Sequence, residues 1–349
     1  ATHAGMSGKN NEDRYAVSAF QLGEDDPTPV VLAVLADGIG GHRAGEVASE
    51  MAVEIISRQV AASDARSPIE TLTAAIHLAS QQIYAAAQVD ENRAGMGSTC
   101  SCAWIIDDRL YTATVGDSRI YLLRGGSINQ LSTDHTWIQE ALERHILTPE
   151  QARNHPNQHV IRRYLGSPTP PLVDNRMRLE TKGEASEAYQ GLQLVAGDRL
   201  LLCSDGLTDL VSDAEILENL DGLEPNAALQ ALVDLANARG GHDNITIILL
   251  HAPALVSPAR KARRKSPVLL AAAVVLLLSL IAAGIWGVSE LVKSITQVDK
   301  PTPTPGLVTI TAPGAGQAVT PSRFVTSTLL PSGATTAAPT PALSITPPL

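Results

Sequence analysis

The chain has 349 residues, enough for one large domain or two ordinary ones, and its 44% hydrophobic residues can fill a sizeable core. Residues 1–251 are acidic, with 18 Lys plus Arg against 34 Asp plus Glu. Binding to a nucleic acid backbone needs a basic face, so this charge argues against nucleic acid as a partner. It is compatible with carboxylates gathered around cations.

Residues 1–251 alternate between strand-like and helix-like stretches. Apolar runs bounded by turn residues predict strands at 30–36, 98–106, 109–115, 118–123, 192–195, 199–204 and 244–250. Helical spacing of apolar residues predicts helices at 44–62 and 68–88. Two shorter helices are also predicted: one begins at the capping box of Ser212, and the other begins at Pro225. Short turns favour antiparallel pairing, so helices on a mainly antiparallel sheet are expected.

Two further features of this region bear on the site. Residues 134–165 hold four histidines and two prolines in mixed polar sequence, which predicts a mobile segment near the site. Cys100, Cys102 and Cys203 are too few for a disulfide framework and too sparse for a zinc site, so we expect them to be buried in strands. A reducing, cytoplasmic location follows as an expectation, and the start of the chain has no signal-peptide pattern.

The remaining residues differ sharply in composition. Residues 268–288 are apolar except for one Ser, which predicts a transmembrane helix, and a basic juxtamembrane linker at 252–267 precedes it. The positive-inside rule then places residues 1–251 in the cytoplasm and the tail, 289–349, outside. That tail is rich in Pro, Thr, Ser and Ala, which predicts a disordered extracytoplasmic segment in a single-pass protein of the cell membrane.

Acidic residues occur repeatedly where a strand meets a turn. Taken singly, each Asp reads as a turn former or a cap of backbone N–H groups. Strands brought together in one sheet would gather their terminal carboxylates, which repel unless cations lie between them. Oxygen-only ligands favour Mg²⁺ or Mn²⁺ over zinc. The five positions are Asn11-Glu12-Asp13, Asp37-Gly38, Gly116-Asp117-Ser118, Ser204-Asp205-Gly206 and Asp243-Asn244.

Two metals that share a water molecule can lower its pKa and direct it at phosphorus, so no protein nucleophile is needed. The sequence contains no nucleophile elbow, no P-loop and no cysteine in an electropositive setting. A small glycine after Asp37 also lets the Gly38 carbonyl approach a metal. The residues thus point to metal-dependent hydrolysis of a phosphate ester.

Taken in order, these motifs resemble one known family. The series comprises Gly5, Asn11-Glu12-Asp13-Arg14, Val34-Leu35-Ala36-Asp37-Gly38-Ile39-Gly40-Gly41-His42, Gly45-Glu46, Gly97-Ser98-Thr99, Val115-Gly116-Asp117-Ser118-Arg119, Leu202-Cys203-Ser204-Asp205-Gly206-Leu207 and Asp243-Asn244-Ile245-Thr246. It is similar to the PPM family, the type 2C protein serine/threonine phosphatases, and covers almost all of residues 1–251.

The resemblance implies an α+β fold, an antiparallel β-sandwich flanked by helix pairs in four α/β/β/α layers, with a binuclear Mn²⁺ or Mg²⁺ centre at one end. By position, Asp37 would bridge both metals, the Gly38 carbonyl would bind one, and Asp205 and Asp243 would bind the other. Glu12 and Asp13 would hold metal-bound waters. Asp117 matches the residue that joins Asp205 at a third, weaker metal site, and residues 134–165 match the family's flap.

This chain departs from the better-known family pattern at two positions. Gly8 stands where many members have an Arg that grips the substrate phosphate, and Lys9 or Arg14 is the candidate replacement. Lys gives a point charge rather than a bidentate fork. Ile39 stands where eukaryotic members have a His, so protonation of the leaving group would fall to a metal-bound water. His42 is interpreted as a neutral ring that packs the turn.

Three hypotheses on function follow. The first is an enzyme that removes phosphate from serine or threonine of cytoplasmic proteins and opposes a Ser/Thr kinase. The second, suggested by Gly8 and Ile39, is a catalytically weak membrane-bound receptor for phosphoproteins; such a receptor is expected to lose metal ligands, and none is missing. The third, a sensor that reads the cell exterior through its tail, is compatible with either.

Overall fold

The computed structural model describes residues 1–23, 25–40, 44–152, 155–179 and 185–252. The predicted transmembrane helix, the tail and all but the first residue of the basic linker lie outside the described residues, as does His42. Within the described part of the chain, no helix is long and apolar enough to cross a membrane.

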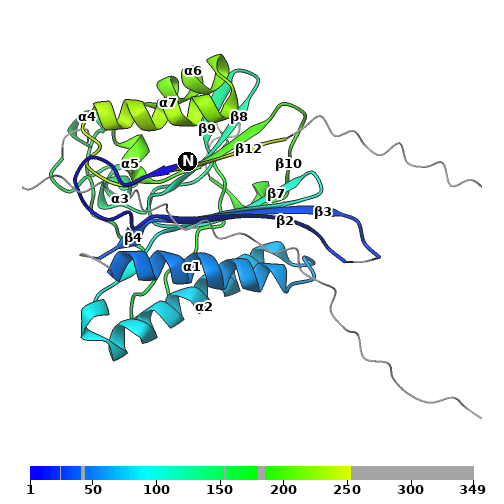
Figure 1. Ribbon diagram of the computed structural model, residues 1–349, viewed down its shortest axis with the longest axis horizontal. Coiled ribbons are helices and arrows are strands. Elements are labelled where there is room, and N and C mark those ends of the chain that lie inside the picture. Colours follow the sequence, from blue (N-terminus) through cyan, green and yellow to red (C-terminus); the bar gives the residue numbers. More distant parts are fainter. Residues whose placement is uncertain (24, 41–43, 153–154, 180–184, 253–349) are drawn as a thin grey trace, which may run out of the picture. The chain divides into compact units, whose positions relative to one another are not determined.

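Two five-stranded antiparallel sheets form the centre of the domain (Figure 1). In order across the first sheet, its strands are β1 (Thr2–His3), β12 (Ile245–His251), β11 (Arg199–Cys203), β8 (Arg119–Arg124) and β9 (Ser127–Gln130). The second sheet has the order β10 (Leu192–Gln193), β7 (Arg109–Val115), β6 (Cys100–Ile106), β3 (Pro29–Ala36) and β2 (Arg14–Gln21). A two-residue ladder joins β4 (Gly38–Ile39) to β5 (Gly97–Ser98).

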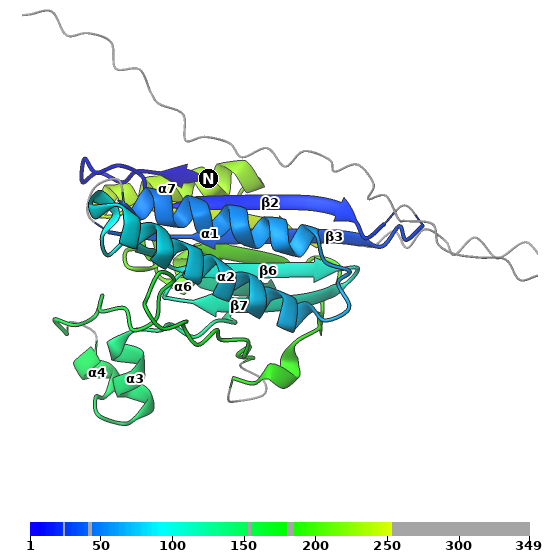
Figure 2. The ribbon, with the colours of Figure 1, turned by 90° about the horizontal axis from the view of Figure 1, so that it is seen from below.

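Helix pairs cover the outer faces of both sheets. Helices α1 (Ala44–Ala61) and α2 (Pro68–Val89) pack on the second sheet through a core that includes Ile56, Ile76 and Trp104. Helices α6 (Asp213–Gly222) and α7 (Pro225–Ala238) pack on the first sheet around Leu201 and Leu232. A third apolar cluster, with Leu35, Ile120 and Leu202, fills the space between the sheets. These are the four predicted α/β/β/α layers, which Figures 1 and 2 show.

The shorter helices lie in the connections. They are α3 (Trp137–Glu143), α4 (Pro149–Ala152) and α5 (Asp205–Thr208), with the 3₁₀ turns η1 (Glu91–Arg93) and η3 (Glu187–Tyr189). The segment that holds α3 and α4 is closed at its base, where Thr136 pairs with Ile161. Figure 2 shows α3 and α4 together, projecting beyond the sheets.

The predicted elements agree with the structure to within a residue or two, apart from a break at Thr99 and a β10 of only two residues. The capping box at Ser212 is present at the start of α6. Strand β2 was not predicted; it is an edge strand, partly exposed on both faces, and Ser18 interrupts its apolar residues. All three cysteines are free and buried, as predicted.

Candidate metal centre

The strand connections bring the predicted acidic residues to one end of the two sheets. Asp37 follows the end of β3, and the start of β2 lies beside it because Arg14 pairs with Ala36. Asp205 follows the end of β11, and β12 begins beside it because Cys203 pairs with Ile247. Pairing within each sheet, together with packing of the two sheets, gathers residues that are far apart in the sequence: Glu12, Asp13, Asp37, Asp117, Asp205 and Asp243.

The carboxylates of this cluster raise one another's pKa. Burial, followed by the charges of Asp13 and Asp205, raises the pKa of Asp37 well above its usual value. Burial and then the charges of Asp117 and Asp209 do the same for Asp205. Each of these carboxylates is therefore close enough to the others for their negative charges to repel.

Three of these carboxyl groups have a buried oxygen without a hydrogen-bond partner among the described residues. They are Oδ1 of Asp13, Asp117 and Asp205. A buried, unpaired carboxylate oxygen is costly unless a cation or donor faces it. The donor set, made of oxygens alone, suits Mg²⁺ or Mn²⁺, so these side chains fit the divalent cations that the sequence predicts.

Backbone contacts hold Asp37 in place. Its N–H donates to Thr99 Oγ1 at 3.0 Å, and its carbonyl accepts from the Thr99 N–H at 2.8 Å and from Ser98 Oγ at 3.0 Å. At Gly38, a Cβ atom would lie 2.8 Å from the Glu12 carbonyl oxygen and closer still to that of Gly45. Only glycine fits there, which is a packing reason for the Asp-Gly pair that turn chemistry alone does not give.

The loop of Glu12 and Asp13 is tied to the start of β12. Asn244 Oδ1 accepts the Glu12 N–H at 2.7 Å, and Asn244 Nδ2 donates to the carbonyls of Ala4 and Asn10 at 3.1 Å each.

Ser204 Oγ donates to Asp13 Oδ2 at 2.8 Å. Burial raises the pKa of Asp13 to about 6 against the hydrogen bonds from Thr246 and Ser204, which lower it. Burial followed by the charge of Asp243 raises the pKa of Glu12 to about 7. Asn244 and Ser204 belong to the sequence motifs, but their hydrogen bonds to the loop of Glu12 and Asp13 were not predicted.

A polar cavity of about 500 Å³ opens beside Asp117 and Asp205. Its lining combines the end of the sheets with the predicted flap: Asp117, Arg119, Asp134, Thr136, Ile138, Gln139, Leu142, Gln158, His159, Asp205, Thr208, Asp209 and His242. Residues 134–165 therefore do lie at the site. Their mobility stays a prediction.

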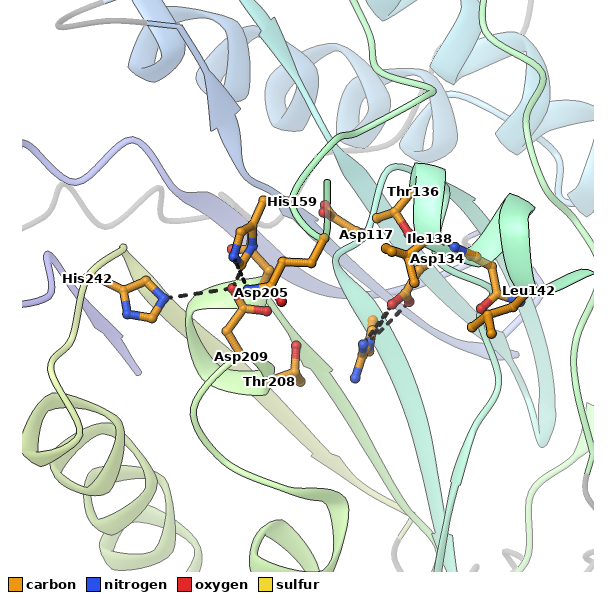
Figure 3. Close-up of a pocket in the computed structure, with 13 residues that line it drawn as sticks. Asp117, Asp134, Thr136, Ile138, Leu142, His159, Asp205, Thr208, Asp209 and His242 are labelled. Atoms are coloured by element: carbon orange, nitrogen blue, oxygen red, sulfur yellow. Dashed lines mark hydrogen bonds and ion pairs between the residues drawn. The ribbon is translucent and has the colours of Figure 1, made fainter. Parts of the chain in front are cut away.

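Asp209 is a residue of this cavity that the sequence reasoning missed. Its Oδ2 lies 3.2 Å from His159 Nδ1 and 3.8 Å from His242 Nε2, and Figure 3 shows both rings directed at it. His159, Asp205 and Asp209 each offer a ligand atom within 4.8 Å of the others. The signal in the sequence was its position four residues after Asp205, directly after the end of α5 and so one helical turn further on.

The structure separates the two candidates for the missing phosphate-gripping Arg. The Arg14 guanidinium is bonded to Glu46 and donates to the carbonyls of Asn11 and Asp13 at 2.9 and 2.8 Å. Arg14 therefore stabilises the loop of residues 11–13, and its guanidinium is occupied by these contacts. Lys9 is exposed, and its positive charge acts on Glu12, where it partly offsets the rise in the Glu12 pKa.

Comparison with known proteins agrees with this geometry. The family model for protein phosphatase 2C matches residues 2–240. The serine/threonine protein phosphatase PstP of Mycobacterium tuberculosis is 34% identical over 245 residues, which are 70% of this chain and 43% of PstP. The chain therefore spans less than half the length of that relative.

Two solved structures have the same fold over the described domain. The S. agalactiae serine/threonine phosphatase is 34% identical, with a TM-score of 0.62 over 72% of this chain and 97% of that one. The catalytic domain of PstP in complex with two manganese ions is 33% identical, with a TM-score of 0.56 over 71% of this chain and 94% of that one.

The fold and the cluster of carboxylates define a phosphatase domain of the metal-dependent class. The chain belongs to the protein phosphatase 2C family, the PPM serine/threonine phosphatases. The family resemblance inferred from the sequence is confirmed.

Proposed function

We propose that residues 1–251 hydrolyse phosphoserine and phosphothreonine on proteins, with two divalent cations, Mn²⁺ or Mg²⁺, as cofactors. The observation that carries the proposal is the cluster of Asp37, Asp205 and Asp243, in which a buried oxygen of Asp205, like those of the neighbouring Asp13 and Asp117, has no hydrogen-bond partner among the described residues. The catalytic domain of PstP was solved in complex with two manganese ions, which supports Mn²⁺ here.

The proposed roles follow the position of each residue. Asp37 and the Gly38 carbonyl would hold one cation. Asp205 and Asp243 would hold the second cation, to which Asp37 would also bind. Asp117 with Asp205 would hold a third ion, and Glu12 and Asp13 would orient water. When bound, the cations supply positive charge that acidifies water and screens the phosphate. Lys9 would steer the phosphate towards the site as a point charge.

The fixed geometry of these side chains is what the protein itself contributes. Thr99 connects the two acidic turns, because its Oγ1 accepts the Asp37 N–H and lies 2.8 Å from Ser118 Oγ. Ser204 donates to Oδ2 of Asp13, while the buried Oδ1 of Asp13 has no hydrogen-bond partner among the described residues. These hydrogen bonds fix the position of each carboxylate before substrate binds, which is a condition for efficient catalysis.

The direct test measures phosphate release from phosphothreonine peptides by the full chain, with Mn²⁺ and with excess chelator. Asp205→Asn removes a ligand, while Asp198→Asn changes a buried Asp at the opposite end of β11, where it pairs with Arg124. We expect metal-dependent turnover in the wild type and in Asp198→Asn, and its loss in Asp205→Asn. A wild type with no Mn²⁺-dependent turnover above that of Asp205→Asn would refute the proposal and favour the phosphoprotein receptor suggested by Gly8 and Ile39.

Membrane anchoring is a separate proposal that rests on the sequence alone. Residues 268–288 would form one transmembrane helix, with residues 1–251 in the cytoplasm, the basic linker 252–267 at the inner surface and the tail 289–349 outside. The substrates would then include phosphoproteins near the membrane, among them a Ser/Thr kinase that the phosphatase opposes. A topology reporter fused after Leu349 should be active only outside the cytoplasm; activity inside would overturn the orientation.

A further inference from the structure

His135 is a buried histidine beside the site to which neither the sequence motifs nor the proposed metal ligands give a role. Its side chain is 3% exposed. Its backbone N–H donates to the Gly116 carbonyl at 2.9 Å, and its ring Nδ1 accepts the Gly116 N–H at 3.0 Å. One residue therefore satisfies both backbone polar groups of Gly116, which immediately precedes Asp117.

The turn at Gly116 needs this support. Its φ of +108° lies in a region that favours glycine, and a Cβ atom would lie 2.6 Å from the Thr99 side chain. The peptide is thus packed tightly against Thr99 on one side and bonded to His135 through its polar groups. A shift of His135 would move the backbone that carries the Asp117 carboxyl group.

The partners of His135 determine where its ring proton lies. A backbone N–H can only donate, so the Nδ1 that faces Gly116 carries no proton. The second nitrogen, Nε2, lies 3.3 Å from Asp174 Oδ2. Asp174 is held as a carboxylate by Arg176, which donates from Nε at 2.9 Å and from Nη2 at 2.5 Å. A carboxylate accepts, so Nε2 carries the proton and the ring is neutral.

The same group of residues reaches the base of the flap. Asp174 pairs through its backbone with Thr114 on β7, at 3.0 and 2.9 Å. The His135 carbonyl accepts the Arg162 N–H at 2.7 Å, so both ends of the 134–165 segment meet at this residue. His135 thus connects the flap base, the Asp174–Arg176 ion pair and the Gly116–Asp117 turn.

We propose that His135 is a positioning residue: its neutral Nε2–H ring, braced by Asp174 and Arg176, fixes the Gly116 peptide and thereby the orientation of Asp117 for the weakest-bound metal ion. The part of this proposal that concerns metal binding rests on the proposed function. The tautomer of His135 and its hydrogen bond to Gly116 are independent of the proposed function. Groups behind metal ligands that fix their orientation are worth about 10- to 100-fold in metal affinity.

Two substitutions separate the two ends of the ring. His135→Asn keeps an acceptor near the position of Nδ1 and loses the reach to Asp174. His135→Gln keeps a donor near the position of Nε2 and loses the acceptor for Gly116. His77→Gln is the matched control, because His77 is a partly buried histidine on α2 whose Nε2 lies 3.1 Å from the Pro171 carbonyl oxygen, away from the cluster.

The first measurement needs no metal. The full chain is labelled with ¹⁵N-histidine and ¹⁵N-glycine and treated with chelator, and the signal that disappears in His135→Gln assigns the ring. We expect ring shifts of the Nε2–H tautomer in the wild type. We also expect slow hydrogen exchange of the Gly116 amide that becomes fast in His135→Gln and stays slow in His135→Asn. An Nδ1–H ring, or unchanged exchange in both variants, would overturn the proposal.

The second measurement titrates Mn²⁺ into the same proteins and follows binding by calorimetry beside kcat and KM. His135→Gln should weaken the weakest class of Mn²⁺ sites about 10-fold and lower kcat with little change in KM, and His135→Asn should recover most of the loss. His77→Gln should match the wild type. Equal Mn²⁺ binding in all four proteins would refute the positioning role. A wild type without Mn²⁺-dependent turnover would refute the proposed function and leave the ring and amide results standing.

Discussion

Replacing Asp117 by Asn is expected to stabilise the metal-free protein at alkaline pH while it removes a proposed metal ligand. Asp117 is buried, and burial followed by the charge of Asp134 raises its pKa to about 7. In the absence of metal its negative charge therefore opposes folding. An Asn of the same shape carries no charge and escapes that cost.

The magnitude follows from the pKa. A rise from 3.8 to about 7 corresponds to a penalty of about 4 kcal/mol at pH 8, where the group is ionised in both the folded and the unfolded state. As the pH falls below 7 the folded protein takes up the proton first, so the penalty shrinks to about 2 kcal/mol at pH 5 and vanishes below 3.8. Burying an imperfectly paired amide costs about 1–3 kcal/mol, which leaves a net gain of about 1–3 kcal/mol at pH 8.

Equilibrium urea unfolding of the wild type and Asp117→Asn at pH 8 and pH 5, with chelator, measures this difference. We expect the variant to be the more stable protein at pH 8 and to lose that advantage at pH 5. Saturating Mn²⁺ should reverse the order at pH 8, because only the wild type gains binding energy from this ligand. A variant that is equally destabilised at both pH values without metal would refute the electrostatic reasoning.

Three further predictions test neighbouring features. Gly38→Ala should lower activity at least 10-fold and destabilise the domain by about 2 kcal/mol or more, since its Cβ atom would meet the Glu12 and Gly45 carbonyls; steady-state kinetics and thermal unfolding measure this. Asp198→Asn should cost about 2–4 kcal/mol in urea unfolding by breaking the pair with Arg124, yet keep the same Mn²⁺ requirement. Lys9→Ala should raise KM for phosphopeptides about 3-fold at low salt with kcat unchanged, an effect that 0.5 M salt abolishes. An unchanged KM would exclude Lys9 from phosphate binding.

The sequence was informative about the site because its acidic residues follow or precede strongly apolar strands. Antiparallel pairing within one sheet brings Asp205 beside Asp243, and packing of the second sheet on the first brings Asp37 to the same end of the sandwich. The boundaries of α6 and α7 were also predictable, since a capping box and a Gly-Gly pair mark them locally.

Other features were beyond local reasoning because they depend on tertiary contacts. The pairing of His135 with Asp174 joins residues 39 apart in the sequence, and no spacing rule connects them. Asp209 gains its role from His159 in the flap and His242 before β12, which meet it only in the fold. Strand β2 is a partly exposed edge strand in which Ser18 interrupts the apolar residues, so its signal in the sequence is weaker than that of the buried strands.

The most direct test of the metal centre is calorimetric titration of Mn²⁺ into the chelator-treated full chain, compared between the wild type, Asp205→Asn and Asp198→Asn. We predict that the wild type and Asp198→Asn bind at least two Mn²⁺ ions, since the site has the ligands for a pair, and that Asp205→Asn loses at least one of them. Binding of the same number of ions with the same affinity by Asp205→Asn would contradict the assignment of this cluster as the metal centre.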